Sequence, residues 1–584
     1  MLRRIFSYMK EYKKYAWLAL ICIGVEVVLE IMVPKLMADL IDIGVTNSDV
    51  PYIINKGIQM AVCAVAALIL GVGSARFSAL AGQGLGANIR KAEYEKLQSY
   101  SFSNIDHFSV SSLVTRLTSD VTNIQNAVST GMRPFGRSPV MLIFATTLAF
   151  QINSTLALVF LVALPVLAVL LIIIIINVGP RYGRMQGAVD LVNRCIEENL
   201  TAVRVVKSYV RGDYEIEKFG HVNDNLKNES EKAFGIAVLN MPAMQFVMYS
   251  TILGILLIGG RLINSGQMMI GQLTSFLSYV LLILNSLMMM SNVFLLMTRS
   301  LASAERIMKV IDEPIDITDE NAKDIEVKKG EIEFNHVWFK YKDTAKEYVL
   351  SDVSFHINAG QTVGIIGQTG SSKTTLIQLI PRLYDASKGE IKIDGINVKE
   401  YPVRHLRDAI SVVLQKNTLF SGSLIDNLRW GDENATLDEI KEACSIACVD
   451  EFIDRLPGGL DAEMGQEGVN VSGGQKQRIC IARAILKKPK VLILDDSTSA
   501  VDTATEGKIR NALAKKLPDM TKIIIAQRIS SVCHADQIII MDGGRVDAIG
   551  THESLLRTNK IYQEIYESQK EGACLLYTSP SPRD

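Results

Sequence analysis

Cysteine is scarce in this sequence, and neither sign of charge predominates. Eight cysteines are scattered over 584 residues and none belongs to a Cys-x-x-Cys pair, so we expect reduced thiols that act as small apolar residues. Lysine and arginine total 61 against 62 aspartates and glutamates, a formal net charge of −1. That balance gives no reason to expect a nucleic-acid partner, and the few cysteines argue against a secreted protein.

Charged side chains are missing from long stretches of the first half of the chain. None occurs from Ser138 to Pro180, and Arg261 is the only one from Ala233 to Thr298. A helix crosses the ~30 Å hydrocarbon core of a bilayer in about 20 residues, so each stretch predicts two spans. Two further apolar segments precede them, and no single soluble core grows large enough to bury all of these. We predict six spans within a membrane domain of residues 1–310, at about 15–33, 57–81, 136–151, 154–178, 240–262 and 270–298.

Basic residues predict the orientation of these spans. They gather before the first span and in the loops after the second and fourth, whereas the opposite loops hold little beyond Lys35, Lys56 and Arg261. The positive-inside rule then places both termini in the cytoplasm of a multi-pass cell-membrane protein. Both long cytoplasmic loops are expected to be mainly helical, with short transverse turns at Asn104–Phe108 and Tyr209–Tyr214.

Two acidic residues, Glu26 and Glu30, lie one helical turn apart in the first span. Acids inside a membrane are costly and face a cavity or a partner. Either they form a cation-binding or substrate-facing pair, or they lie near the bilayer edge and bond a neighbouring helix.

The second half of the chain has the composition of an α/β domain. After a charged, proline-containing linker at 311–330, short strands alternate with helices over residues 331–571, which predicts a largely parallel sheet. An apolar strand at 362–366 runs into a glycine-rich loop and then a helix, the context of a phosphate-binding loop. Its predicted ligand-binding residues are Gly367, Thr369, Gly370, Ser371, Ser372, Lys373, Thr374 and Thr375.

Within this loop, Lys373 is expected to reach the β- and γ-phosphates, and the hydroxyl of Thr374 to meet Mg²⁺. Ser372 departs from the usual pattern, which has glycine before the lysine. Asp495 ends an apolar strand, where a carboxylate can hold Mg²⁺. A second anion site is predicted where Ser472, Gly473, Gly474 and Gln475 open a helix. Two facing copies of such a domain use both sites, whereas a single phosphate-loop enzyme has little use for the second.

These motifs occur in the order seen in ABC transporters, together with Gln415 and with Ser499-Ala500-Val501-Asp502. Six spans ahead of one such domain resemble the half-transporter arrangement of ABC exporters of the multidrug and lipid-flippase type, over about residues 1–570. The resemblance implies a membrane all-α six-helix exporter domain followed by an α/β P-loop nucleotide-binding domain.

The resemblance also implies ATP and Mg²⁺ as cofactors and roles for particular residues. Tyr341 would stack on adenine; the alternative interpretation is an ordinary strand residue. Gln415 would join Thr374 and Asp495 at the metal and link it to the membrane part, Asp502 would belong to the nucleotide site, and the two transverse turns would be coupling helices.

Two residues depart from the pattern of hydrolysis-competent family members. Asp496 stands where those members have the glutamate that polarises the attacking water, and Gln527 stands where they have the switch histidine. Aspartate is about 1.5 Å shorter, and a displacement near 1 Å can cost about 100-fold in rate. The amide of Gln527 cannot carry the positive charge of an imidazolium.

We therefore expect a degenerate ATP site that resembles that of one subunit of a bacterial heterodimeric multidrug exporter. The expected partner is a second half-transporter with glutamate and histidine in its own site. A slow homodimeric exporter and a nucleotide-gated regulatory or channel-like ABC protein are the alternatives.

The cargo is not readable beyond a small amphipathic molecule, drug or lipid. The run Met288-Met289-Met290, with Asn285 and Asn292, suits adaptable binding, but these residues also suit lipid contact or packing. Membrane lipid is the other expected partner.

The last residues, Cys574–Asp584, do not resemble the end of that family. They can be back-translated into the transposase adapter of a sequencing-library kit, so we expect an artefact and leave them out of the fold. The natural end is expected a little beyond Gly572.

Overall fold

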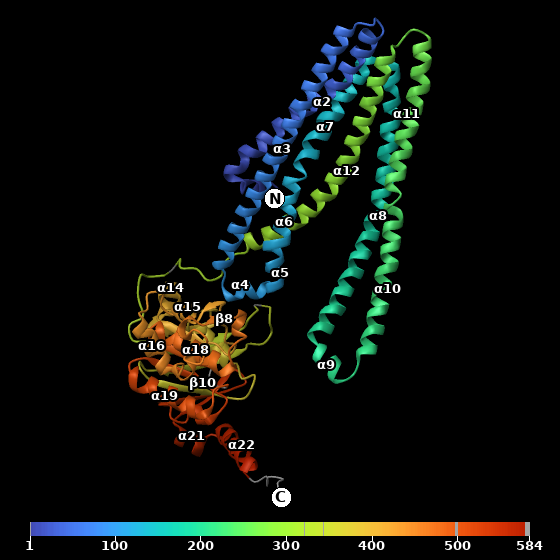
Figure 1. Ribbon diagram of the computed structural model, residues 1–584. Coiled ribbons are helices and arrows are strands. Elements are labelled where there is room, and N and C mark those ends of the chain that lie inside the picture. The colour runs from blue at the N-terminus through green and yellow to red at the C-terminus, as the bar shows by residue number, and fades with distance from the viewer. Residues whose placement is uncertain (1, 321, 343, 497–499, 578–584) are drawn as a thin grey trace. The chain divides into compact units, whose positions relative to one another are not determined.

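The computed structural model describes residues 2–320, 322–342, 344–496 and 500–577. The chain forms two compact units, the first of residues 1–98 and 111–312 and the second of residues 99–110 and 313–584. The first consists of long helices, and the second contains the strands (Figure 1). The predicted order, a helical part followed by an α/β part, is confirmed.

Long helices joined by short turns make up the first unit. Its longest, α3 and α8, have 49 and 48 residues and continue far beyond the predicted spans they contain. The bounds are α1 (Leu2–Ser7), η1 (Lys10–Tyr12), α2 (Lys13–Asp39), η2 (Leu40–Val45), α3 (Val50–Gln98), α5 (Val110–Thr115), η3 (Arg116–Asp120), α6 (Val121–Ser129), α7 (Met132–Ile152), α8 (Ser154–Thr201), α9 (Val203–Ser208), α10 (Gly212–Ala237), α11 (Asn240–Asn264) and α12 (Ile270–Asp312).

Several of these helices meet the requirements of a membrane span. Within the described residues, five helical stretches are long and apolar enough to cross a bilayer: Lys10–Val45, Val50–Gln98, Val110–Ile152, Gly212–Asn264 and Ile270–Met290. The predicted span 154–178 lies within α8, several of whose side chains are outside the described set. Six spans therefore remain a prediction from the sequence.

One apolar core of the first unit joins α2, α7, α8, α11 and α12. Ile23 of α2 is buried there, and the buried Tyr279 of α12 donates its hydroxyl to the carbonyl oxygen of Ile31 at 3.0 Å. Other faces expose large apolar side chains, including Leu68 and Ile176, each 66% exposed. Helices that are apolar on buried and exposed faces alike are typical of membrane spans.

The two predicted transverse turns have different outcomes. Helix α4 (Phe102–His107) overlaps the first, Asn104–Phe108. At the second, the short helix α9 precedes the predicted segment Tyr209–Tyr214, which holds a turn and the start of α10 (Figure 1). The positive φ of Val210, 53°, explains the difference, because a residue in the left-handed region ends a helix.

A six-stranded sheet in the order β12-β11-β3-β10-β9-β6 forms the centre of the second unit. Its neighbouring strands are parallel except for β11 and β12. The other sheets are the antiparallel β2-β1-β4-β5 and the pair β7-β8. The strands are β1 (Ile332–Phe339), β2 (Leu350–Ile357), β3 (Thr362–Ile366), β4 (Lys388–Ile393), β5 (Ile396–Asn397), β6 (Ile410–Val413), β7 (Gly422–Ser423), β8 (Glu463–Met464), β9 (Val491–Asp495), β10 (Thr521–Ile525), β11 (Gln537–Asp542) and β12 (Arg545–Gly550).

Two apolar cores enclose this central sheet. Side chains alternate between the faces of a strand, so Ile365 packs in the core shared with the antiparallel sheet and Ile366 in the core shared with the helices. The helices of this unit are α4, α13 (Lys373–Leu379), η4 (Val398–Glu400), α14 (Val403–Asp408), α15 (Leu424–Arg429), α16 (Leu437–Ile446), α17 (Asp450–Ile453), η5 (Gly459–Asp461), η6 (Gln466–Gly468), α18 (Gly473–Leu486), α19 (Thr503–Lys516), α20 (Ile529–Val532), α21 (His552–Thr558) and α22 (Lys560–Tyr577). Ser499 and residues 578–584 lie outside the described residues.

Helix α4 belongs to the second unit although it follows α3 in the chain. A capping box between Ser101 and Asn104 starts the helix. The amide of Asn104 then donates to the carbonyl oxygen of Pro314 at 2.8 Å, and the hydroxyl of Tyr384 donates to Asp106 at 2.7 Å. These contacts attach the short transverse helix to the domain that carries the phosphate loop.

Candidate functional site

The phosphate loop lies at the carboxyl end of the central strand β3, where it leads into α13. A Cβ at Gly367 would lie 2.2 Å from the carbonyl oxygen of Met541, so the close backbone approach requires glycine. Gly370 and Ser372 both have positive φ, 89° and 67°. Glycine adopts this conformation freely, whereas Ser372 adopts it at a cost of about 1–2 kcal/mol. The departure from the usual glycine therefore leaves the loop conformation intact.

Lys373 closes the loop over its own backbone. Its ammonium donates to the carbonyl oxygens of Gly367 and Gln368 at 2.9 and 2.8 Å and to the Ser371 hydroxyl at 3.1 Å. Burial lowers the pKa of Lys373, and the carboxylates of Asp495 and Asp496 oppose that shift. The ammonium is thus fixed at the mouth of the loop, from which it can reach a phosphate.

Asp495 ends β9 beside the loop, and its residue is only 2% exposed. The Thr374 hydroxyl donates to its Oδ1 at 3.3 Å, whereas its buried Oδ2 has no hydrogen-bond partner among the residues that the structure describes. Burial raises the pKa of Asp495, and the Thr374 hydrogen bond opposes the rise. A buried carboxylate oxygen without a donor is suited to a cation or its water shell.

Asp496 follows immediately, with a φ of 46°, and turns toward two amides. Nε2 of Gln527 donates to its Oδ2 at 2.9 Å, and Nε2 of Gln415 donates to the same oxygen at a longer 3.5 Å. Burial raises the pKa of Asp496, and these amides oppose the rise. The two departures from the family pattern thus contact each other, which inspection of single positions had not revealed.

A pocket of about 330 Å³ gathers most of the predicted site residues. It is lined by residues of the phosphate loop, of the two aspartates and of the switch position. These are Thr369, Gly370, Ser372, Lys373, Thr374, Thr375, Gln415, Asp495, Asp496, Ile525 and Gln527. Of the two predicted loop residues outside this lining, Gly367 and Ser371, both contact Lys373.

The predicted second anion site does not line this pocket. Ser472 caps α18, with its N–H donating to Oε1 of Gln475 at 2.9 Å and the Gln475 N–H returning to its hydroxyl at 3.3 Å. Gly474 needs its missing side chain, because a Cβ there would lie 2.7 Å from the carbonyl oxygen of Ala500. Asp502 caps α19 by accepting from the Thr505 N–H at 2.9 Å and is exposed. Both segments are thus held by their caps and accessible, and neither lines the phosphate-loop pocket.

Tyr341 contacts the phosphate-loop helix through its hydroxyl. That hydroxyl lies 2.9 Å from the Thr375 hydroxyl and donates to Gln378 at 3.4 Å. Tyr341 is 43% exposed, and its ring packs edge-on against that of Tyr384. The ring therefore borders the loop, and its exposed part is available to a planar ligand.

Glu26 and Glu30 pair with arginines that the sequence analysis overlooked. Arg133 donates to Glu26 at 2.6 Å, and Arg137 donates to Glu26 at 3.4 Å and to Glu30 at 2.7 Å. Both arginines lie in α7, close before the charge-free stretch. Their spacing of four residues, the same as that of Glu26 and Glu30, was the signal available in the sequence. The structure favours the interpretation of acids bonded to a neighbouring helix.

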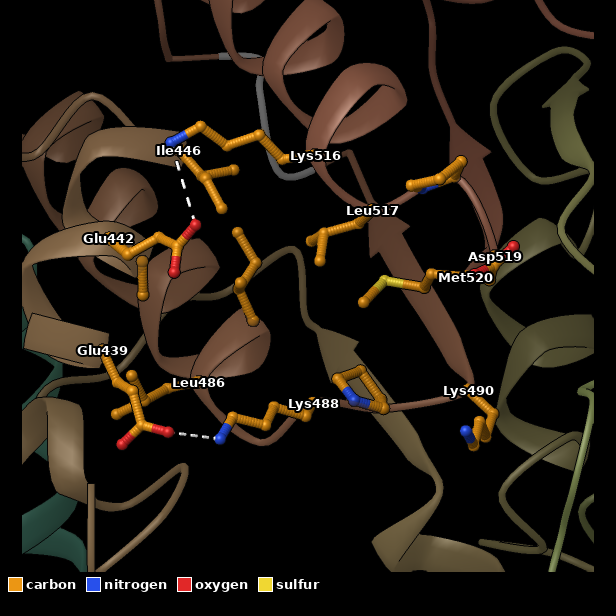
Figure 2. A pocket seen from close by; sticks show the side chains of 14 residues that line it. Glu439, Glu442, Ile446, Leu486, Lys488, Lys490, Lys516, Leu517, Asp519 and Met520 are labelled. Carbon is orange, nitrogen blue, oxygen red and sulfur yellow. Dashed lines mark hydrogen bonds and ion pairs between the residues drawn. The ribbon is translucent and has the colours of Figure 1, made fainter. Parts of the chain in front are cut away.

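A further pocket, of about 290 Å³, lies between α16, the ends of α18 and α19, and the starts of β9 and β10. Lys488 pairs there with Glu439, and Lys516 with Glu442 (Figure 2). No predicted site residue lines it, so the candidate site is the pocket at the phosphate loop.

Comparisons with known proteins agree with this geometry. The family models "ABC transporter transmembrane region" and "ABC transporter" match residues 16–287 and 350–499. The ABC transporter ATP-binding protein YfiB of Bacillus subtilis is 38% identical over 98% of this chain and 100% of its own length. The ATP-dependent lipid A-core flippase of Pseudomonas putida is 32% identical over 96% and 95%, and the putative multidrug export ATP-binding/permease protein YgaD of B. subtilis is 31% identical over 82% and 83%.

A solved structure of a bacterial Atm1-family ABC exporter with ATP bound has a TM-score of 0.81 to this chain. It covers 96% of this chain and 98% of its own at 22% identity, and so supports the fold. Because relatives above 30% identity match along nearly the whole chain, and because the ATP-binding motifs form one pocket, the chain belongs to the ATP-hydrolysing exporters of the ABC transporter family.

Proposed function

We propose that this chain exports a small amphipathic molecule, drug or lipid across the cell membrane, as one half of a heterodimer whose hydrolysis occurs mainly in the partner's site. Relatives named as a lipid A-core flippase and as a putative multidrug exporter support this cargo class. The mechanism is alternating access. ATP draws two nucleotide-binding domains together, the transverse helices transmit the closure to the spans, and hydrolysis resets the cavity.

The contact between Asp496 and Gln527 carries the proposal of a degenerate site. Polarising a water requires a carboxylate oxygen within hydrogen-bond reach of that water, and the amide of Gln527 competes with the water for Oδ2 of Asp496. The carboxylate is also shorter than that of a glutamate, and the neighbouring amides carry no charge to stabilise the transferring phosphoryl group. The site keeps its binding residues and lacks both side chains that act on water and γ-phosphate.

Mg²⁺ is part of the proposal, held by Thr374, Asp495 and Gln415. Oδ2 of Asp495, which has no partner within the described part of the chain, supports this donor set, since Mg²⁺ is commonly held by one or two carboxylates, substrate phosphates and water. When bound, the ion would neutralise charge on the phosphates. The chain's own contribution is to hold ATP by Lys373 and to orient the ion's water shell.

The predicted partner is a second half-transporter with glutamate and histidine in its site. The exposed segment Ser472–Gln475 is intact, and its capping box holds the backbone N–H groups at the start of α18 in place. In the assembly this segment and Asp502 would complete the partner's site, and Tyr341 would stack on the adenine bound by this chain. A homodimer would instead place two degenerate sites together.

Substitution of Asp496 by asparagine tests the proposal in the assembled pair. Asp496→Asn should change ATP turnover less than about threefold, whereas the same change at the partner's glutamate should abolish it, about 100-fold or more. The Lys373→Ala chain serves as the control for loss of ATP binding in this site. Equal collapse after both carboxylate changes, or brisk hydrolysis by a stable dimer of this chain alone, contradicts the proposal.

Transport against a gradient tests the export function. ATP-dependent uptake of amphipathic cargo into inside-out vesicles is expected, whereas a nucleotide-gated channel would only equilibrate it. Met288, Met289 and Met290 are half-buried and Asn285 is exposed in α12, while the side chain of Asn292 lies outside the described set. Met289→Ala should alter cargo preference if this run contacts cargo, and leave it unchanged if the run only packs.

A further inference from the structure

We propose that Gln569, on the C-terminal helix α22, positions the switch residue Gln527 against Asp496. The side-chain amide of Gln569 makes two hydrogen bonds to the backbone around Arg528. Its Nε2 donates to the carbonyl oxygen of Gln527 at 2.8 Å, and its Oε1 accepts from the N–H of Ile529 at 2.9 Å. One amide thus uses both its donor and its acceptor on the same short segment, which we call the switch segment (residues 526–530).

This contact continues to the phosphate-loop pocket. Gln527 lines that pocket, and its side chain donates to Asp496 at 2.9 Å. Its main-chain carbonyl is held from the other side by Gln569. Because the backbone orientation of a residue fixes the direction of its side chain, Gln569 determines whether the amide of Gln527 faces the carboxylate.

The helix that carries Gln569 is itself anchored at other points. Tyr562 is fully buried, with its hydroxyl 2.7 Å from Nδ1 of His552, and Nε2 of Gln563 donates to the carbonyl oxygen of Leu556 in α21 at 2.6 Å. These contacts make α22 a fixed support for the switch segment, independent of the bonds that Gln569 makes.

The switch segment has room to move once these bonds are broken. A cavity of about 780 Å³ separates part of it from the C-terminal helices, and its lining includes Arg528, Cys533, Tyr566 and Gln569. Ala526 and Ile529 are buried in the core, and Arg510 donates to the carbonyl oxygen of Ser530 at 3.0 Å. Packing therefore anchors the ends of the segment, and the two Gln569 bonds act on the backbone of Gln527 and Arg528 between them. The inference rests on the proposed function, since it assumes that this pocket holds ATP.

The consequence is a longer residence of ATP in this chain's own site. A wall of the pocket that fluctuates must be ordered again whenever nucleotide binds, which weakens binding. Part of the stabilisation from these hydrogen bonds is lost with them, which should speed the release of bound ATP about three- to tenfold. The rate of cleavage in the partner's site should stay the same.

The test uses the full-length chain in lipid nanodiscs with a fluorescent ATP analogue. Gln569→Met removes both hydrogen bonds at similar length, and Gln563→Met is the matched control, since it removes one bond of the same helix to α21. We expect hydrogen exchange at the Ile529 amide to rise at least about tenfold, and analogue release to speed up, in the Gln569→Met chain only. Gln569→Glu keeps the acceptor for Ile529 and loses the donor to Gln527, so it should speed release while Ile529 stays protected.

Two results overturn the inference: equal exchange at Ile529 in both methionine variants, or raised exchange with unchanged analogue release. A merely structural role of Gln569 would lower thermal stability in both variants alike and leave these two readouts unseparated, which also overturns it. If the unaltered chain binds no analogue, the proposed function fails, and the exchange measurement still decides by itself whether Gln569 holds the switch segment.

Discussion

Arg137 of α7 pairs with two carboxylates on the neighbouring helix α2. It contacts both Glu26 and Glu30, and its side chain is only 16% exposed, beside a Glu26 side chain that is 7% exposed. An ion pair taken out of water gains little net stability, but removal of one partner leaves the other charge buried and uncompensated. The ion pairs therefore serve chiefly to fix how α2 and α7 align along each other.

At Arg137, substitution by methionine should destabilise the chain strongly. We expect a loss of about 3 kcal/mol in unfolding free energy, the typical cost of breaking a buried pair, measured by denaturant unfolding in detergent micelles. Lys91→Met is the control, since Lys91 and Glu95 form an exposed pair at 4.0 Å whose loss should hardly matter. Equal shifts in the two variants would contradict the buried-pair interpretation.

Single residues show what the sequence could and could not predict. The phosphate loop was predictable because strand, loop and helix are contiguous, so spacing alone brings Lys373 and Thr374 together. The contact between Asp496 and Gln527 was not, because the two lie 31 residues apart and meet only through the pairing of Asp495 with Ile525 in β9 and β10. The arginine partners of Glu26 were missed for the same reason: they lie on another helix, and the sequence of one segment does not show how two helices align.

Among the elements, α4 overlaps the segment that the resemblance suggests as a coupling helix. It is only six residues long. The Tyr384 hydroxyl donates to its Asp106, and its own Asn104 donates to the carbonyl oxygen of Pro314. Burial, together with Asp106, raises the pKa of the Tyr384 phenol, so it remains a donor at physiological pH. A short helix held by a few directed bonds can transmit motion only while those bonds persist.

Loss of the Tyr384 hydroxyl should uncouple transport from ATP use. Tyr384→Phe removes one charge-assisted hydrogen bond, worth about 1.5–3 kcal/mol, and should lower cargo uptake several-fold while ATP binding changes little. Uptake per ATP hydrolysed in vesicles is the measurement. Tyr401→Phe is the matched control, because its buried hydroxyl donates to the carbonyl oxygen of Ile393 within the same domain. A parallel fall in both variants would argue against a coupling role.

Element type was predictable along most of the chain, whereas the exact ends of the elements were not. The long cytoplasmic loops were expected to be mainly helical, and α3 and α8, with 49 and 48 residues, extend far beyond the predicted spans. The short helix α9 ends at Ser208, just before the predicted segment 209–214, because Val210 takes the left-handed conformation and ends the helix.

The whole molecule is predicted to have both termini in the cytoplasm. The basic residues of the loops after spans two and four support this orientation, and the two loop positions Ser208 and Ser265 are both exposed. Ser265→Cys should react with a membrane-impermeant maleimide in intact cells, whereas Ser208→Cys should react only in inverted membranes. Labelling of the unaltered chain gives the background, and the opposite pattern would reverse the topology.

The second unit is discontinuous in sequence, since it includes residues 99–110 as well as 313–584. A fragment expressed from Glu313 onward would lack α4, and the ring of Phe102, which packs at 6.0 Å from that of Tyr384, would be gone. Such an excised domain would expose the apolar surface around Tyr384 that Phe102 covers, and it is therefore a poor reagent for crystallisation or calorimetry. A chimera that carries this nucleotide-binding unit on another transporter therefore needs both of its segments, residues 99–110 as well as the segment from residue 313 onward.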